Sequence, residues 1–390
     1  MSPPPKILFL CGSLEPGKSG VGDYTRTLAQ ELLRLYGIQS MILALNDGSV
    51  NERTESDRNK TPSVPEIRLP QGSEKNWRKE TDKIIQDFAP DWVSLQYVGY
   101  SYNTYGCGYP ITRLLETLPK TIKLHIMFHE LWEGFGVNDS LKVRVRGFLQ
   151  KRSVKKLVST SKPSIIHTQN AFYVKQLRKL GTDAKYLPLF GNIPIATKDT
   201  NRALALIQKT GTISATQAER HRYLVFIFFG SIYPSWPGEE LMNYVHGALP
   251  NLEKRVLFLS IGKLGAQRGN WDSLRKRYSD YFEFVELGFL ETSEISILLQ
   301  EADFGVATTP FEALGKSGSF ITMQEHGLPV FASQGMLREN KDGDCLDKEP
   351  NAYPINRDAI AQIHNPPEKG SQQSRLPQTI HSFVKDLNLL

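Results

Sequence analysis

Residues 6–33, KILFLCGSLEPGKSGVGDYTRTLAQELL, place a short apolar run before a glycine-rich turn and a helical pattern. The run from Ile7 to Leu10 contains no polar residue, which is typical of a parallel strand covered on both faces. From Tyr24 onward, leucines recur at helical spacing with polar residues between them. The stretch therefore predicts a strand, a turn and a helix, the unit from which parallel α/β sheets are built.

The turn between strand and helix holds four glycines, Gly12, Gly17, Gly20 and Gly22. Because glycine has no side chain, such a turn lets the backbone approach a ligand closely and directs N–H groups and the helix dipole toward an anion. We therefore expect a functional site here, with Asp23 at the start of the helix as a further candidate. A tight turn capped by Asp23 is the purely structural alternative.

Residues 12–19 also read G-x-x-x-x-G-K-S, the phosphate-binding P-loop pattern, in the strand–turn–helix setting that this motif requires. Two features argue against a nucleotide triphosphatase or kinase. Gly20 and Gly22 follow the motif at once and weaken the first helical turn by roughly 1 kcal/mol each relative to alanine. No later apolar strand ends in an acidic residue that would hold Mg²⁺, since residues 226–229 are followed by Gly230 and Ser231. The P-loop function stays open as an alternative.

Composition indicates an ordinary globular protein: 390 residues with 40% hydrophobic content are enough for two or three domains. Lys and Arg number 47 against 41 Asp and Glu, a mild excess that suits anionic ligands or surfaces but is no nucleic-acid signature. The three cysteines lack metal-ligand spacing, so we expect neither a zinc site nor a disulfide framework. Without an 18-residue apolar run or a signal peptide pattern, we expect a cytoplasmic protein with at most peripheral membrane contact.

Strand and helix patterns alternate through the first half of the chain. We expect strands at residues 40–45, 92–97, 123–128, 164–168 and 184–187, and helices at 80–88, 111–118, a long one ending at 157, and 171–180. Residues 46–75 are polar and contain proline, which predicts a loop. Alternation of this length predicts a doubly wound parallel sheet in residues 1–195.

A second series repeats this plan after a polar segment at residues 196–222. We expect strands at residues 223–229, 255–261, 282–286, 304–307 and 330–332, and helices at 239–247, 271–281, 293–301 and 317–326. The sequence therefore predicts an α/β protein with two Rossmann-like domains facing a cleft. The second domain would cover residues 196–390 and end in a helix at 379–390.

Ligands of such sheets bind beyond the carboxyl ends of the strands, so residues that follow a strand are the best candidates for a site. His129 and Glu130 follow the strand at 123–128, with Trp132 close behind. A lone histidine in this place is also compatible with a buried, hydrogen-bonded structural group. The neighbouring Glu130 and Trp132 favour a functional site.

A third candidate is the loop at residues 308–319, TTPFEALGKSGS, between a predicted strand and helix. Four small residues there offer backbone N–H and hydroxyl donors at a helix N-terminus: Gly315, Ser317, Gly318 and Ser319. Lys316 adds a cation, and the combination suits a diphosphate. Lys263, in a glycine-containing turn after another strand, is placed to reach the same site. A serine-capped helix with solvated lysines is the structural alternative.

In their order along the chain, these stretches resemble a retaining glycosyltransferase of the GT-B class, close to glycosyltransferase family 4. The resemblance rests on GKSGVGDYTRTLAQEL, DWVSLQYV, MFHELW, YLPLFGNIP and EADFGVATTPFEALGKSGSFITMQEHGLPVFAS, and covers nearly the whole chain. It implies that the first domain receives the acceptor and that the second binds a nucleotide-diphosphate sugar, of UDP or GDP, as donor. It implies no cofactor and no metal ion.

The resemblance also assigns roles to residues. It places His129 beside the transferred sugar, with Gly20 and Gly22 against the donor sugar or phosphate. It places Lys316, Ser317, Gly318 and Ser319 of the second domain on the diphosphate. From their positions after strands, we expect Gly315 and Lys263 to bind the donor as well. Asp23 and Glu130 fall on the acceptor side.

The chain departs from family 4 at one motif. Members carry two glutamates eight positions apart, before a turn that aligns with residues 327–329, and Leu314 and Thr322 stand at those two positions here. We expect Glu312 to replace the first glutamate as a catalytic residue. Within the same fold, a nucleotide-sugar epimerase and a non-catalytic sugar-nucleotide binder remain alternatives.

Residues 140–158, SLKVRVRGFLQKRSVKKLV, carry seven basic residues and no acidic one, with apolar residues between them. The pattern predicts either a solvated helix face or a helix lying on an anionic membrane, where each basic residue contributes about 1 kcal/mol. Peripheral contact with the inner membrane face would suit a lipid-linked acceptor, whereas a solvated helix would suit a soluble saccharide.

Overall fold

The computed structural model describes residues 4–17, 19–56, 64–136, 139–209, 217–233, 236–333 and 349–389. Within these residues the chain forms two compact units. Unit 1 comprises Met1–Pro188 and Pro377–Leu390, and unit 2 comprises Leu189–Gly335 and Asp344–Leu376. The described chain therefore passes between the units after Pro188 and again after Leu376.

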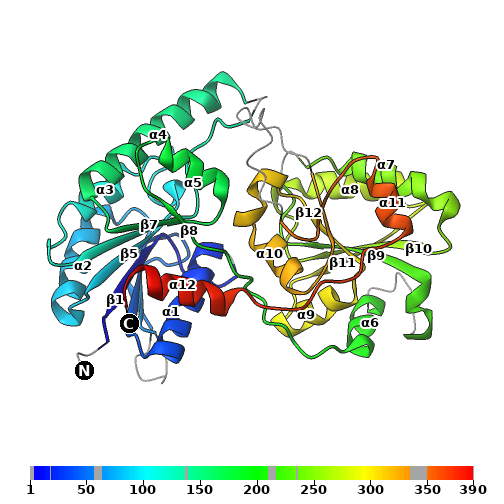
Figure 1. The fold of residues 1–390 in the computed structure, drawn as a ribbon, viewed down its shortest axis with the longest axis horizontal. Coiled ribbons are helices and arrows are strands. Elements are labelled where there is room, and N and C mark those ends of the chain that lie inside the picture. Colours follow the sequence, from blue (N-terminus) through cyan, green and yellow to red (C-terminus); the bar gives the residue numbers. More distant parts are fainter. Residues whose placement is uncertain are drawn as a thin grey trace. The chain divides into compact units, whose positions relative to one another are not determined.

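Unit 1 is built on an eight-stranded sheet with helices packed against it (Figure 1). Its strands are β1 (Ile7–Cys11), β2 (Ser40–Asp47), β3 (Thr54–Glu55), β4 (Glu66–Pro70), β5 (Trp92–Tyr97), β6 (Lys123–Phe128), β7 (Ile165–Thr168) and β8 (Lys185–Tyr186). Its helices are α1 (Gly20–Tyr36), α2 (Glu74–Phe88), the 3-10 turn η1 (Gly99–Ser101), α3 (Tyr109–Leu115), α4 (Leu141–Ser161), α5 (Ala171–Arg178) and α12 (Leu376–Asp386).

The strand order β3-β4-β2-β1-β5-β6-β7-β8 is parallel except between β3 and β4. The apolar run that opens the chain is β1, and all its residues are buried. Ile7 pairs with Ser40 of β2 on one side and with Trp92 of β5 on the other. The order of strands reverses between β1 and β5, and such a switch point is where ligands of these sheets bind. The glycine-rich loop after β1 lies at this point.

Unit 2 repeats the architecture with a six-stranded parallel sheet, in the order β11-β10-β9-β12-β13-β14. Its strands are β9 (Tyr223–Phe229), β10 (Arg255–Ile261), β11 (Glu283–Gly288), β12 (Phe304–Ala307), β13 (Val330–Ala332) and β14 (Ala352–Pro354). Its helices are α6 (Thr200–Gln208), α7 (Gly238–Ala248), α8 (Arg268–Tyr278), α9 (Thr292–Glu301), α10 (Gly318–Glu325) and α11 (Ala359–His364), with 3-10 turns η2 (Gln217–Arg222), η3 (Leu249–Asn251), η4 (Gly265–Gln267) and η5 (Phe311–Lys316). The prediction of two doubly wound parallel sheets is confirmed.

Two segments in which we expected no strand or helix contain regular structure. Strand β4 pairs with β2 inside the predicted loop at residues 46–75, with Ile67 opposite Leu43, so that prediction was wrong. Helix α6 lies inside the polar segment at 196–222 and packs against α9. Both elements were missed for one reason: β4 is only five residues long, α6 only nine, and each buries a single face. So few apolar residues do not stand out from their polar neighbours.

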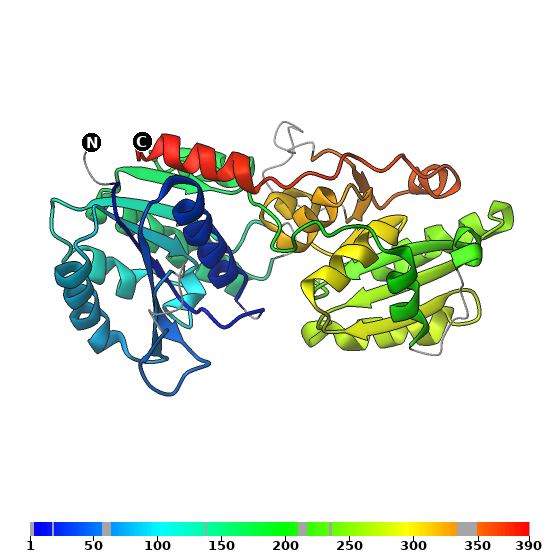
Figure 2. The same ribbon diagram turned by 90° about the horizontal axis from the view of Figure 1, so that it is seen from below.

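Helix α12 packs against the sheet of unit 1, although we expected the terminal helix in the C-terminal domain (Figure 2). The ring of Phe383 lies 6.4 Å from that of Phe9 in β1 and 5.3 Å from that of His125 in β6, measured between ring centroids. Asp386 Oδ2 lies 3.0 Å from His167 Nε2 in β7. The last helix of the chain therefore covers the core of the first unit.

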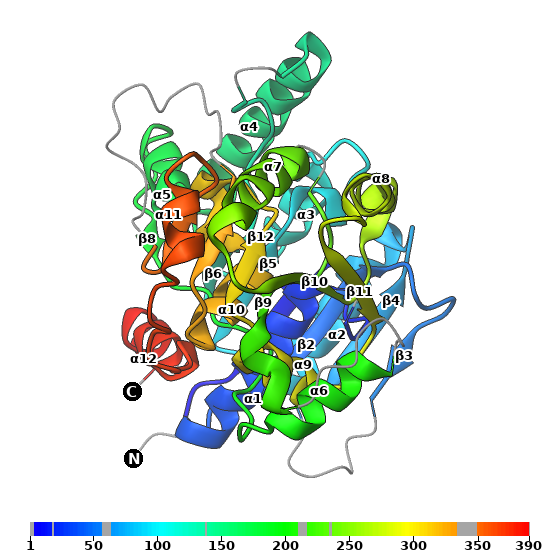
Figure 3. The same cartoon turned by 90° about the vertical axis from the view of Figure 1, so that its right-hand side faces the viewer.

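Helix α4 packs beside α3 and extends past its neighbours (Figure 3). Its inner side is buried through Gly147, Gln150, Ser153, Val154 and Leu157. Its outer side exposes between 48% and 76% of four large apolar residues, Leu141, Val145, Phe148 and Leu149. Among the described residues, no helix combines the length and hydrophobicity that crossing a bilayer requires.

Candidate functional site

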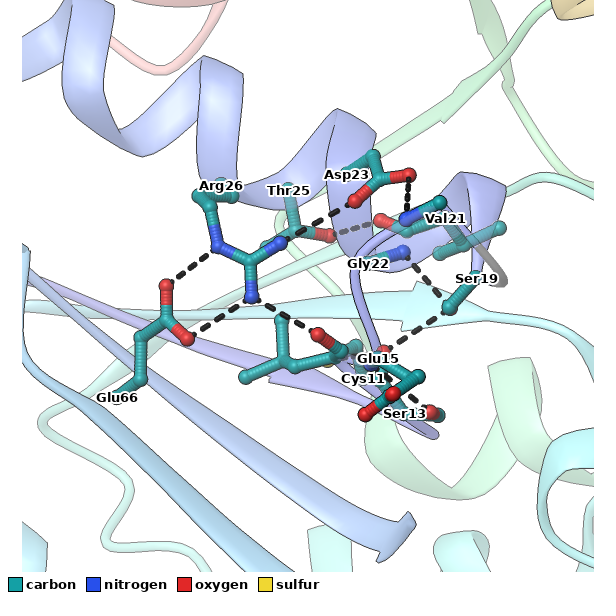
Figure 4. Close-up of polar contacts among 12 residues, drawn as sticks. Cys11, Ser13, Glu15, Ser19, Val21, Gly22, Asp23, Thr25, Arg26 and Glu66 are labelled. Carbon is teal, nitrogen blue, oxygen red and sulfur yellow. Dashed lines mark hydrogen bonds and ion pairs between the residues drawn. The ribbon is translucent and has the colours of Figure 1, made fainter. Parts of the chain in front are cut away.

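The loop after β1 is held by hydrogen bonds among its own residues (Figure 4). The Ser19 hydroxyl donates to the Ser13 carbonyl oxygen over 3.1 Å and accepts from the Gly22 amide over 3.1 Å. Ser19 is therefore the N-cap of α1, in place of Asp23. The Asp23 carboxylate instead accepts from the Gly17 amide over 3.1 Å and closes the loop.

Arg26 fixes this loop to the rest of the sheet. Its Nε and Nη2 atoms donate to the two oxygens of Glu66 in β4 over 2.6 and 2.9 Å, a bidentate pair that sets the plane of the guanidinium. Nη2 also donates to the Leu14 carbonyl over 2.9 Å, and Nη1 lies 3.2 Å from Asp23. Asp23 is thus held in place within the loop, and its acceptor-side role stays a prediction.

Asp47, at the end of β2, holds the glycine loop through a hydrogen bond to its backbone. Its fully buried carboxylate accepts from the Leu14 amide over 2.9 Å and pairs with Arg68 Nε over 2.7 Å. Burial alone would raise the pKa of Asp47, but Arg68 and the amides of Leu14 and Ser49 lower it to about 2. Sequence analysis passed over this aspartate, because it ended the strand at residue 45 and placed Asp47 in the loop at residues 46–75.

Two glycines of the loop differ in what the fold requires of them. A Cβ added to Gly22 would lie 2.5 Å from the Ser13 carbonyl oxygen, so α1 can approach the loop only at a glycine. A Cβ added to Gly20 would have no atom within 4 Å, and its φ is outside the left-handed region. The packing of unit 1 therefore requires glycine at position 22. It does not require glycine at position 20, where a ligand has room to approach the backbone.

The same contacts bear on the P-loop alternative. A P-loop directs its backbone N–H groups and its serine hydroxyl at phosphate and Mg²⁺. Here the Gly17 N–H faces the Asp23 carboxylate, and the Ser19 hydroxyl both donates and accepts within the loop. Helix α1 begins at Gly20, earlier than we expected, so a weakened helix start is no argument against the motif. Lys18 lies outside the described residues.

His129 follows β6 and lies beside the start of α1. Its ring meets the Tyr24 ring edge-on, with 5.0 Å between centroids, and its Nε2 lies 2.9 Å from Oε1 of Gln96. Burial lowers the pKa of His129 to about 4, against the raising effect of a hydrogen bond with Gln169. The ring is therefore neutral at pH 7, and Gln96 Oε1 would accept a proton carried on Nε2. His129 thus lies close to the glycine loop, as a buried and partnered group.

Two residues that sequence analysis missed lie next to His129. Gln169 and Asn170 follow β7 directly, and both side chains are at most 2% exposed. Asn170 caps α5 by accepting the Tyr173 amide over 2.7 Å. Among the described residues, its Nδ2 atom and the Nε2 atom of Gln169 have no hydrogen-bond partner. Buried amide donors are nearly always satisfied, so this pair points to a ligand oxygen beside His129. Their position after a strand end was the signal available in the sequence.

In unit 2 the loops after β9, β10 and β12 meet at the switch point of the sheet. The Thr308 hydroxyl donates to the Ser231 carbonyl over 3.0 Å, and the Ser231 hydroxyl donates to the Lys263 carbonyl over 3.3 Å. Gly230 and Gly262 follow their strands with φ of 93° and 85°, which favours glycine. Three backbone turns are thereby brought to one edge of the sheet.

Helix α10 begins at this edge. A Cβ added to Gly230 would lie 3.9 Å from the Cβ of Ser319, and the Thr309 hydroxyl donates to that of Ser317 over 3.2 Å. Ser317 caps the helix, and the first amides of a helix have no partner within it. An added Cβ on Gly318 would meet nothing within 4 Å. The structure thus brings the predicted Ser317, Gly318 and Ser319 together with the loop that carries Lys263.

The remaining predicted residues are placed as follows. Gly315 is buried and Lys316 is half-buried at the end of η5, whereas Lys263 is exposed. The backbone of Glu312 lies in η5, and its side chain is outside the described residues. Glu130 is half-buried next to His129. The roles given to these residues stay predictions.

The sequence matches no protein-family model and no curated protein. The structure is similar to Anabaena HepE in complex with UDP-glucose, with 14% identity, a TM-score of 0.59, and 99% of this chain and 100% of that one covered. It is also similar to the catalytic domain of starch synthase IV from Arabidopsis thaliana, bound to ADP and acarbose. That match has 12% identity and a TM-score of 0.60, and covers 99% of each chain. A third similar structure is the UDP-GlcNAc 2-epimerase of Methanocaldococcus jannaschii, with 10% identity, a TM-score of 0.54, and 98% of this chain and 99% of that one covered.

HepE and starch synthase IV have the GT-B fold, and each was solved with a nucleotide or nucleotide sugar in place. Identities this low show a shared fold and leave activity open. The chain thus has the GT-B fold, two Rossmann-like parallel-sheet domains, as the resemblance in its sequence implied.

Proposed function

We propose that this chain is a glycosyltransferase, close to family 4, that transfers a sugar from UDP or GDP to an acceptor with retention of configuration. The observation that carries the proposal is the meeting of α10 with the turns after β9 and β10 at one edge of the unit 2 sheet. Structures of the same fold bind UDP-glucose or ADP, which supports a nucleotide donor. Unit 2 then holds the donor and unit 1 the acceptor.

Transfer breaks the bond between the anomeric carbon and the diphosphate, so negative charge grows on the leaving oxygen. The amides of Gly318 and Ser319 and the ammonium groups of Lys316 and Lys263 are the groups that would stabilise that charge. Fixed N–H groups at a helix N-terminus act without reorganising during the reaction. We keep Glu312 as the residue that replaces the usual family 4 glutamate.

In this proposal, the sugar contacts His129, Gln169 and Asn170 of unit 1. A neutral imidazole does not act as an acid at pH 7, so His129 orients a sugar hydroxyl by hydrogen bonding. The amides of Gln169 and Asn170 offer two donors to sugar oxygens. Gly20 gives the donor room to approach α1, and Asp23 and Glu130 stay on the acceptor side.

The test of the donor is binding. Thermal denaturation with UDP, GDP, ADP and ATP, and with their sugars, should give stabilisation by UDP or GDP and their sugars, since a ligand at 100 times its Kd stabilises by about 2.7 kcal/mol. Stabilisation by Mg²⁺ and ATP alone, lost in a Lys18→Ala variant, would favour the P-loop alternative. No response to any nucleotide would reject the proposal.

The UDP-GlcNAc 2-epimerase of similar fold makes an epimerase the second candidate. Proton NMR of the protein with a bound donor and no acceptor separates the two. A transferase that retains configuration should slowly release a sugar whose first-formed anomer matches that of the donor. An epimerase would instead accumulate the epimeric nucleotide sugar. Donor binding without either product would indicate a non-catalytic binder.

The outer side of α4 supports peripheral contact with an anionic membrane from the cytoplasmic side. Leu141, Val145, Phe148 and Leu149 share one exposed helical face. Three exposed lysines border it on the same helix, Lys142, Lys155 and Lys156. Apolar residues among cations are typical of a helix in the plane of a lipid interface. A lipid-linked acceptor would be reached from this position, whereas a soluble saccharide needs no such contact.

Other basic residues of α4 have protein partners. Arg146 pairs with Glu133, and Lys151 lies over the ring of Trp132 at 5.5 Å. The test therefore changes Lys142, Lys155 and Lys156 together to Gln and measures co-sedimentation with phosphatidylglycerol and phosphatidylcholine vesicles. Binding to the anionic vesicles should be lost. The matched control removes three exposed lysines from α2 of the same unit, Lys75, Lys79 and Lys83, and should still bind. Equal recovery of the parent protein with both vesicles would reject membrane contact.

A further inference from the structure

A continuous row of buried hydrogen bonds crosses the sheet of unit 1 from His129 to the last helix. From His129 Nε2 the first contact is Gln96 Oε1, at 2.9 Å, and Gln96 Nε2 then contacts Ser94 Oγ at 2.8 Å. Ser94 Oγ lies 2.8 Å from His125 Nδ1, and His125 Nε2 lies 3.1 Å from His167 Nδ1. The five groups belong to β5, β6, β7 and the residue after β6, and all are at most 6% exposed.

The row ends on α12, at a group that can only accept. His167 Nε2 lies 3.0 Å from Asp386 Oδ2, and the other oxygen of Asp386 accepts from Lys185 Nζ over 2.7 Å. A carboxylate beside an ammonium group stays ionised and has no proton to donate. Phe383, one helical turn earlier, packs on the rings of both His125 and His167, which places the carboxylate against the row.

The acceptor at the end sets the direction of every bond before it. His167 must donate from Nε2, so its Nδ1 accepts from His125 Nε2 and leaves Nδ1 of His125 as an acceptor. Ser94 then donates to His125 and accepts from Gln96, whose oxygen faces His129. Burial lowers the pKa of both His125 and His167, so each neutral ring carries one proton. The whole row therefore donates toward Asp386.

We propose that Asp386 is a positioning residue that fixes the tautomer of His129 through this row, with the proton on Nε2 and with Nδ1 left as a hydrogen-bond acceptor. An imidazole with Nδ1 unprotonated accepts a hydrogen bond from a hydroxyl. If the transferase function holds, that hydroxyl belongs to the sugar, and this part of the inference rests on the proposed function. The tautomer itself does not.

The tautomer is measured by long-range ¹H–¹⁵N NMR correlation of the full chain labelled with ¹⁵N-histidine, near neutral pH. The signal of His129 is assigned by its loss in a His129→Gln variant. We expect the Nε2–H form for His129, His125 and His167 in the parent protein. A Lys185→Met variant keeps the Asp386 carboxylate and is the matched control, and it should give the same three tautomers.

A charge exchange, Asp386→Lys with Lys185→Glu, puts a donor-only ammonium group at the end of the row. Every bond should reverse, so that His167, His125 and His129 all take the Nδ1–H form. If His167 changes and His129 does not, the proposal is wrong. Ser94→Ala serves if the exchange variant fails to fold: it interrupts the row, so His129 should become a mixture of tautomers while His167 keeps the Nε2–H form. An unchanged His129 in Ser94→Ala would also overturn the proposal.

Kinetics separate this inference from the proposed function. In the exchange variant, kcat for transfer should fall about tenfold with the donor KM nearly unchanged, since the lost contact is made to one hydroxyl. A reversed tautomer with unchanged kcat would leave the row intact and reject the contact of His129 with the sugar. A merely structural Asp386 would change the melting temperature and leave the tautomer of His129 as it was.

Discussion

The carboxylate of Glu325 accepts a hydrogen bond from the Gly191 amide over 3.1 Å, and the same oxygen accepts the Arg375 amide over 2.8 Å. Gly191 lies just after the first passage of the chain between the units, and Arg375 just before the second. One buried side chain of α10 thus fixes both connecting segments on unit 2. On unit 1 they meet again, where the Thr379 hydroxyl donates to the Pro188 carbonyl over 3.1 Å.

Glu325→Gln should change the free energy of unfolding by less than about 1 kcal/mol, because one amide oxygen accepts both N–H groups. Burial raises the pKa of Glu325, because it disfavours the charged carboxylate. Replacing that carboxylate by the neutral amide of Gln therefore adds no desolvation cost. Glu325→Ala should cost about 2 kcal/mol or more, because it leaves two amides without an acceptor. Gly191→Ala should also destabilise, since its Cβ would lie 2.6 Å from Glu325 Oε2. Urea unfolding measures all three. Equal losses for Gln and Ala would contradict this account.

Gly20→Ala and Gly22→Ala test the glycine loop as a matched pair. Gly22→Ala should lower the melting temperature, because its Cβ would meet the Ser13 carbonyl at 2.5 Å. Gly20→Ala should leave the melting temperature unchanged or slightly raised, and yet weaken donor binding or turnover about tenfold. Full activity of Gly20→Ala would remove Gly20 from the site.

Lys316→Ala should weaken binding of UDP or GDP about tenfold and slow transfer, because charge-assisted contact with the diphosphate is lost. Calorimetric titration with the free nucleotide measures the affinity. Lys276→Ala, an exposed lysine on α8 of the same unit, is the control for loss of one positive charge. If both variants bind like the parent, Lys316 has no role in donor binding.

His129→Ala should reduce turnover more than about tenfold while nucleotide affinity stays nearly unchanged, because its proposed contact is to the sugar. Activity must be referred to the folded fraction, since the change also leaves Gln96 without its buried partner. A folded fraction with full activity would make His129 a structural residue only.

Asp47 predicts a pH-dependent stability. Its pKa is lowered from 3.8 to about 2 in the folded protein, so its contribution is present above about pH 4 and is lost as pH falls toward 2. The difference corresponds to about 2 kcal/mol. In urea unfolding, the gap between the parent and Asp47→Asn should be constant near neutral pH and narrow below about pH 4. If the difference in free energy of unfolding between the parent and Asp47→Asn does not change with pH, the variant loses stability through packing alone.

The fold was predictable because its central strands are buried on both faces. Strands β1, β9 and β10 are nearly all apolar, and such runs stand out in a sequence. Edge elements such as β4 and α6 bury one face, and their few apolar residues are lost among polar neighbours. No local pattern indicates which sheet a terminal helix joins, because that depends on contacts between residues far apart in the chain.

The candidate site was predictable where a residue follows a strand end, as His129 does, or caps a helix, as Ser317 does. Its supporting groups were not, because Gln96 and Ser94 stand inside a strand and read as interruptions of an apolar run. Their function depends on hydrogen bonds across neighbouring strands, and these follow from the register of β5 and β6. The structural alternative for Asp23, a helix cap, was also wrong in detail, because its carboxylate accepts from the Gly17 amide and Ser19 caps the helix.

A ribosome makes α12 only after unit 2, so the order of synthesis delays one part of unit 1. Unit 1 receives Phe383 and Asp386 only after the whole of unit 2 has been made. Until then, α12 does not cover the surface around His125 and His167. Domains usually fold as units, beginning with the N-terminal one, so unit 1 folds at first without this helix. Ribosome-bound chains ending at residue 375 should therefore be cut by protease within unit 1 faster than released full-length chains. The first unit is therefore completed only after the second unit has been made.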